Sequence, residues 1–97
     1  MSRKPVHQLG EVVSGVVMKT MSFGVFVRLD NGEDALLKVS NRDGVPRSPL
    51  PQPGTRLECI IVDITPTGED TMPQVDVSRR KVDYERFGKD GPLGPPI

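Results

Sequence analysis

The chain has 97 residues and carries thirteen basic and thirteen acidic side chains, so its formal net charge is zero. It is 35% hydrophobic and 27% charged, which is typical of a globular protein with a single domain. No apolar run approaches the roughly 20 residues that a membrane-spanning helix needs, and no apolar segment of the kind found in signal peptides follows the basic start. The single cysteine, Cys59, excludes an intrachain disulfide. We therefore expect a cytoplasmic protein.

The first half of the chain predicts short strands joined by turns. Residues 1–9 are polar and predict a flexible lead-in. A valine-rich segment, an apolar run and a short segment after the turn signal Asp30-Asn31-Gly32 all favour extended structure. They predict three strands, over residues 10–20, 23–29 and 34–39.

The second half predicts a long connection, two more strands and a tail. Residues 40–54 contain four prolines, which lack an amide hydrogen and disfavour helix at the preceding residue, so irregular structure with at most one short helical turn is expected. Strands are predicted over residues 56–64 and 74–79. We expect residues 82–97 to form a C-terminal tail, in which residues 82–87 pack back as a short helical or extended segment and the end, rich in Gly and Pro, frays.

Five short strands with one long connection after the third predict an all-β fold. The expected architecture is a five-stranded antiparallel Greek-key barrel of the OB type over residues 10–81. The fourth strand fits a small closed barrel because it carries apolar side chains on both faces. One face is predicted to hold Leu57, Cys59 and Ile61, and the other Glu58, Ile60 and Val62.

Two phenylalanines open the second predicted strand. In a regular strand Phe23 and Phe26 would point to opposite faces, because side chains alternate. A bulge at Gly24 would bring both rings onto one face, where they would form a stacking platform for flat ligands such as nucleic-acid bases. The alternative is that both rings belong to an ordinary core, and the spacing alone leaves this open.

Several short motifs together resemble the S1 RNA-binding domain, the OB-fold module named for ribosomal protein S1. The resemblance covers residues 10–81, and the order and spacing of the motifs make it specific. The matching positions are Gly10, Gly15, Val17, the run Phe23-Gly24-Val25-Phe26-Val27-Arg28-Leu29, Gly32, the run Asp34-Ala35-Leu36-Leu37-Lys38-Val39-Ser40, Gly54, Val62, Asp63, Val75, Val77 and Ser78.

The resemblance implies which residues would hold RNA. Phe23 and Phe26 match the family's two stacking aromatics, and Asp63 matches an aspartate that ends the fourth strand. Two positions depart from the family pattern. Lys38 stands where a histidine is usual, and Gln74 stands where an arginine is common.

The basic residues offer candidate phosphate contacts. We expect Lys38 and Arg28 to lie near phosphates, although a solvated lysine and, for Asp63, a turn-capping aspartate are the alternatives. A second basic stretch comprises Arg79, Arg80 and Lys81, and solvated surface charge explains it equally well.

The sequence thus predicts a stand-alone protein that binds single-stranded RNA, in association with ribosomes or transcripts. The alternative is a protein-interaction module that keeps the barrel but binds RNA weakly, through residues 41–53 or the C-terminal tail. One histidine and one cysteine cannot form the common zinc sites, and a phosphate-binding loop motif is absent. We expect no enzyme activity, no metal and no cofactor.

Overall fold

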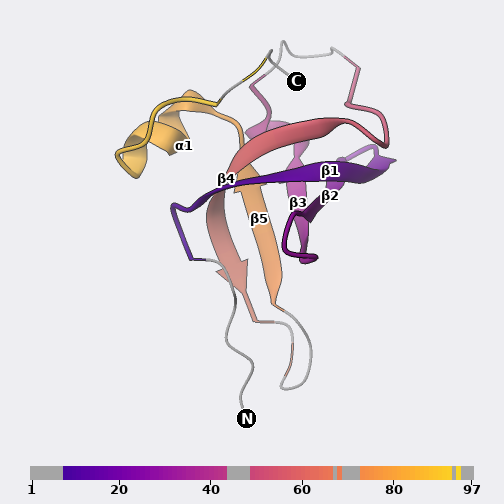
Figure 1. Ribbon diagram of the computed structural model, residues 1–97, viewed down its shortest axis with the longest axis horizontal. Coiled ribbons are helices and arrows are strands. Elements are labelled where there is room, and N and C mark those ends of the chain that lie inside the picture. Colours follow the sequence, from indigo (N-terminus) through magenta and orange to yellow (C-terminus); the bar gives the residue numbers. More distant parts are fainter. Residues whose placement is uncertain (1–7, 44–48, 67, 69–72, 93, 95–97) are drawn as a thin grey trace.

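Five strands form a closed barrel, as the sequence predicts, in the order β1-β2-β3-β5-β4 (Figure 1). The computed structural model describes residues 8–43, 49–66, 68, 73–92 and 94. Its elements are β1 (Val12–Met21), β2 (Gly24–Leu29), β3 (Asp34–Lys38), the 3₁₀ turn η1 (Val39–Asn41), β4 (Arg56–Thr65), β5 (Gln74–Ser78) and α1 (Lys81–Arg86). No helix in this described part of the chain has the length and apolar character to cross a membrane.

Four of the five strand pairings are antiparallel, and the fifth is parallel. β3 and β5 run in the same direction, with Ala35 opposite Val75 and Leu37 opposite Val77. Strand β3 is followed by the long connection and then by β4, so β5 is the strand that fills the gap between β3 and β4. Closure in this way leaves no strand with an unpaired edge.

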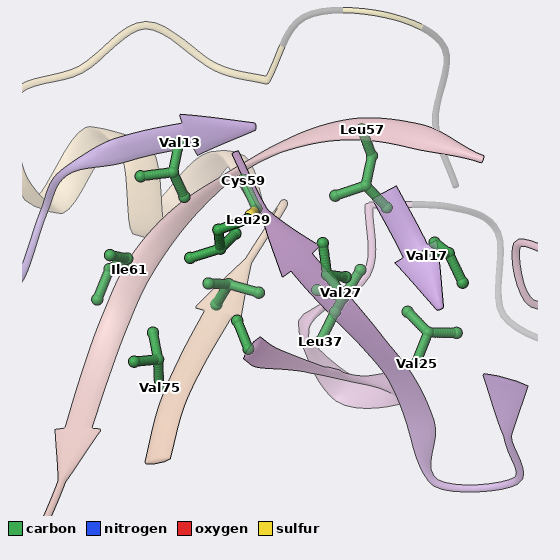
Figure 2. Close-up of a cluster of buried hydrophobic side chains, with 12 residues drawn as sticks. Val13, Val17, Val25, Val27, Leu29, Leu37, Leu57, Cys59, Ile61 and Val75 are labelled. Carbon is green, nitrogen blue, oxygen red and sulfur yellow. The ribbon is translucent and has the colours of Figure 1, made fainter. Parts of the chain in front are cut away.

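The core lies inside the barrel and follows the two-residue period of the strands. On β2, the buried Val25, Val27 and Leu29 alternate with the exposed Phe26 and Arg28. The inward side chains of all five strands form one cluster, drawn in Figure 2. Each fully buried aliphatic side chain of this kind stabilises the fold by about 1.5–3 kcal/mol relative to an exposed one.

The structure confirms that one predicted face of β4 points into the barrel. Leu57, Cys59 and Ile61 are buried in the core (Figure 2). Ile60 is buried as well, outside that cluster, and helix α1 packs against this strand. The buried Tyr84 of α1 donates a hydrogen bond to Glu58 Oε1 at 3.1 Å. The helix therefore covers apolar surface that a two-sided strand would otherwise expose.

Two β-bulges change which side chains face outward. The pairing of β1 with β2 shifts between Val17 and Lys19, and the pairing of β4 with β5 shifts between Ile61 and Asp63. Strict alternation would turn Lys19 and Asp63 to the same side as the buried Val17 and Ile61. Each bulge inserts one extra residue and so directs the next side chain outward. Both Lys19 and Asp63 are exposed.

Arg79, directly after β5, is a buried cation. Its guanidinium donates to both carboxylate oxygens of Asp43, at 2.9 and 3.1 Å, and to the backbone carbonyl of Glu58 at 2.7 Å. The expectation that Arg79 forms a surface stretch with Arg80 and Lys81 is therefore wrong, although those two neighbours are exposed. Arg79 instead joins the end of β5 to the long connection and to β4.

Candidate nucleic-acid interface

Both phenylalanines singled out by the sequence lie on the outer surface of the barrel. Phe23 is 49% exposed and Phe26 is 36% exposed, so the core alternative is wrong for both. Their rings meet edge to face, with centroids 6.1 Å apart and planes at 88°. This is one of the geometries that aromatic pairs prefer. The arrangement presents two ring surfaces to a ligand, at an angle to each other.

The expected bulge at Gly24 is not what brings the rings together. Phe23 belongs to the turn before β2, whereas Gly24 is the first residue of the strand and pairs with both Met21 and Lys38. A Cβ atom at Gly24 would collide with the carbonyl oxygen of Leu37 and lie 3.0 Å from Lys38 Cα. Glycine is therefore needed here for the close approach of β2 to β3.

A hollow of about 500 Å³ lies beside the two rings. Its apolar lining includes Phe23, Phe26 and Leu36, and it continues to Val75 on β5. The lining also includes three polar residues, which are Glu33 from the turn before β3, Asp34 from the start of β3 and Gln74 from the start of β5. The hollow therefore combines flat apolar surfaces with a small number of polar groups, as small-molecule sites commonly do.

The two predicted phosphate contacts each face a carboxylate. Lys38 Nζ lies 3.9 Å from Asp76 Oδ2, and Arg28 Nε donates to Asp34 Oδ1 at 3.0 Å. The hydrogen bond with Asp34, together with its charge, raises the pKa of the Arg28 guanidinium. Both cations are about half exposed. A phosphate would therefore have to compete with Asp76 and Asp34 for them.

Cross-strand pairing places five residues, one from each strand, in a row across the barrel. Lys19 lies opposite Phe26, Phe26 opposite Leu36, Leu36 opposite Asp76, and Asp76 opposite Asp63. Directly paired residues share a face of the sheet. The structure therefore brings Asp63 onto the face that carries Phe26, where it accepts a hydrogen bond from Thr65 Oγ1 at 3.2 Å.

The sequence comparisons agree with this geometry. A sequence model of the S1 RNA binding domain matches residues 6–43, which include both phenylalanines. Polyribonucleotide nucleotidyltransferase of Rhodopirellula baltica is 32% identical over 89 residues, which make up 89% of this chain and 11% of that relative. These two matches support an S1 domain in this chain. It spans only about a tenth of the length of the relative that it matches.

Three solved structures share the fold of this chain. A complex of a/eIF2alpha, aDim2p and rRNA from Pyrococcus horikoshii matches with a TM-score of 0.65 and 20% identity, over 82% of this chain and 49% of that one. An uncharacterized protein of Methanocaldococcus jannaschii matches with a TM-score of 0.56 and 18% identity, over 74% of this chain and 90% of that one. The apo form of Mycoplasma genitalium RNase R matches with a TM-score of 0.54 and 24% identity, over 72% of this chain and 13% of that one.

The structure adds one residue to the candidate interface and removes another. Lys19 lies opposite Phe26 and is exposed, a position that no local sequence signal revealed because it depends on the bulge in β1. Gln74 lines the hollow and donates from its amide nitrogen to Asp76 Oδ1 at 3.2 Å. Arg79 is not available to a ligand, because it is buried against Asp43.

Helix α1 and Phe87, in the described part of the C-terminal segment, do not lie across the two rings. Helix α1 packs against β4, on the left in Figure 1, whereas β2 and β3 lie on the right. Phe87, which follows the helix, packs so closely on Gly10 that a Cβ there would approach its ring to 2.6 Å. The rings of Phe23 and Phe26 thus stay exposed in the presence of α1.

Proposed function

We propose that this S1 domain binds single-stranded RNA by stacking bases on Phe23 and Phe26. In this proposal Lys38, Arg28 and Lys19 contact phosphates, and Asp63 accepts hydrogen bonds at the rim. The observation that carries the proposal is the pair of exposed rings beside the hollow, on a barrel that matches the S1 RNA binding domain. The names of the similar proteins, a polyribonucleotide nucleotidyltransferase, an rRNA complex and RNase R, support an RNA ligand.

We further propose that the domain acts as a binding module without catalysis of its own, in the cytoplasm and on ribosomes or transcripts. Contacts to the 2′-hydroxyl would favour RNA over DNA. In the longer relative, the part that matches this chain is 11% of the length. This is consistent with a domain that supplies RNA binding within a larger protein.

The ion pairs limit the affinity that this surface can reach. Stacking contributes about 1–3 kcal/mol per base, so two rings supply about 2–6 kcal/mol, and about 4 kcal/mol alone corresponds to millimolar binding. The rest must come from phosphates, which have to compete with Asp76 for Lys38 and with Asp34 for Arg28. We therefore expect affinity no tighter than micromolar for this domain alone.

An NMR titration of the isotope-labelled protein with a short single-stranded RNA tests the proposal. Amide shifts should centre on β2 and β3. The binding constant should fall as salt rises, and the slope of its logarithm against the logarithm of the salt concentration should be near −0.7 for each phosphate contacted. The double variant F23L/F26L should lose most of its affinity for RNA, while its NMR spectrum remains that of a folded protein. Val82→Ala, a change of an exposed apolar side chain on α1, is the matched control and should bind like the original protein. Absence of shifts at millimolar RNA would overturn the proposal.

The pairing of Lys38 and Arg28 with carboxylates also favours a second candidate, a protein-interaction module. Of its two expected surfaces, residues 44–48 of the long connection lie outside the described residues. The other is the C-terminal segment, where Val82 of α1 is 52% exposed. If RNA causes no shifts, capture of protein partners on the immobilised domain and on its Val82→Glu variant would test this candidate.

A further inference from the structure

The polar side chains that line the hollow supply mainly hydrogen-bond acceptors. Glu33 and Asp34 line it with carboxylates, and Gln74 lines it with an amide. The amide nitrogen of Gln74 donates to Asp76 Oδ1 at 3.2 Å. That contact directs the nitrogen toward Asp76 and leaves the carbonyl oxygen of Gln74 to face other groups. The surroundings of the hollow therefore favour a ligand that carries hydrogen-bond donors.

Asp34 is an exposed member of this set of acceptors. Its side chain is 61% exposed, and its contact with Arg28 engages only the Oδ1 oxygen through Nε. A carboxylate offers about four lone-pair sites on two oxygens, so one such contact leaves acceptor capacity for a ligand. Asp34 lies on β3 two residues before Leu36, and side chains two apart on a strand share a face. Its carboxylate is therefore next to the apolar surface on which a base would rest.

The four bases differ in the donors that they present. Guanine carries two adjacent donor groups, N1–H and the N2 amino group, which match the two oxygens of a carboxylate. Adenine and cytosine each place an amino group beside a ring nitrogen that accepts, and uracil flanks its single N3–H with two carbonyl oxygens. In single-stranded RNA these edges are free to be read. An acceptor-rich hollow thus favours guanine most and uracil least.

We propose that this hollow selects guanine, with Asp34 as the residue that determines the preference. The proposal rests on the proposed function, because it assumes that a base lies against Phe23 and Phe26. It concerns the identity of one base only. Stacking and phosphate contacts would hold the neighbouring nucleotides without regard to sequence.

Binding of short oligouridines with one central substitution tests the preference by fluorescence anisotropy. The central nucleotide is guanosine, inosine, adenosine or uridine. Inosine is guanosine without the N2 amino group, so the comparison isolates one hydrogen bond. We expect guanosine to bind about tenfold more tightly than inosine, the effect of one hydrogen bond to a charged group, and uridine to bind most weakly.

Variants at two exposed ion pairs locate the effect. Asp34→Asn should bring the ratio of guanosine to inosine affinity close to one. Asp30→Asn is the matched control, because Asp30 also pairs with an exposed arginine, Arg56, and does not belong to the lining of the hollow. Loss of the Arg28 contact in Asp34→Asn would change the affinity for all oligomers alike and would leave the ratio unaffected.

Each outcome separates this inference from the proposed function. Equal affinities for the guanosine, inosine and uridine oligomers would overturn the preference and leave RNA binding intact. A guanosine preference that persists unchanged in Asp34→Asn would overturn the role of Asp34. Failure of every oligomer to bind would overturn the proposed function itself.

Discussion

Replacing Arg79 with methionine should destabilise the domain strongly, although Arg79 follows the last strand and lies outside the candidate interface. Methionine preserves much of the length of the side chain and removes the guanidinium. The change removes the bidentate donor of the Asp43 carboxylate, which is only 15% exposed, and the donor 2.7 Å from the carbonyl oxygen of Glu58.

The size of the effect follows from the burial of this pair. Removing one partner of a buried ion pair costs about 3–5 kcal/mol, which is a large fraction of the roughly 5–15 kcal/mol that stabilises a typical domain. In a domain of this size each kcal/mol shifts the melting temperature by about 4–8 °C. Arg79→Met should therefore lower the melting temperature by at least about 12 °C.

A second bidentate pair supplies the control. Arg56 contacts both oxygens of Asp30, at 3.0 and 2.7 Å, but both side chains are more than half exposed. Exposed pairs contribute little, because water solvates both charges, so Arg56→Met should leave the free energy of unfolding nearly unchanged. Thermal and urea denaturation, followed by the fluorescence of the single tyrosine, Tyr84, measure both variants. Equal denaturation midpoints for the two variants would refute the argument from burial.

Two further predictions concern the interface and the core. Asp76→Asn should release Lys38 to contact phosphate and steepen the dependence of log Kd on log salt by about 0.7, whereas an unchanged slope in an anisotropy titration would show that Lys38 does not reach the RNA. Burial raises the pKa of the Cys59 thiol from 9.0 to about 12. The thiol of the unfolded chain therefore ionises at lower pH than the thiol of the folded protein. As a result, the free energy of unfolding should fall as pH rises from about 9 to about 12. Cys59→Ala should flatten this decline in urea titrations at alkaline pH, and identical pH profiles for the two proteins would contradict the shift.

The fold was predictable from the sequence because its signals are local. A valine-rich segment and an apolar run placed the first two strands, and the turn signal Asp30-Asn31-Gly32 separated the second strand from the third. Alternating side chains placed the last two. The two bulges were not predictable, because Val17-Met18-Lys19 and Ile61-Val62-Asp63 look like ordinary strand sequence. Where an extra residue is accommodated depends on the partner strand, so the outward direction of Lys19 and Asp63 follows from pairing across the sheet.

The electrostatics of the candidate interface were predictable only in outline. A net charge of zero indicated that carboxylates balance the cations, but not which ones meet. Lys38 pairs with Asp76, and Arg79 pairs with Asp43, across long sequence separations that the closed barrel bridges. The same closure buries Arg79, which the sequence presents as one member of a basic run.

The parallel pairing of β3 with β5 has a consequence for synthesis of the chain. Until residues 74–78 have emerged from the ribosome, β3 and β4 each lack a neighbour on one side. Unpaired edges of this kind template association with other chains, and partly made domains are prone to aggregate for this reason. A nascent or truncated chain that stops before Gln74 would hence be a target for chaperones or proteases, and it would also lack the side of the hollow that Gln74 and Val75 form.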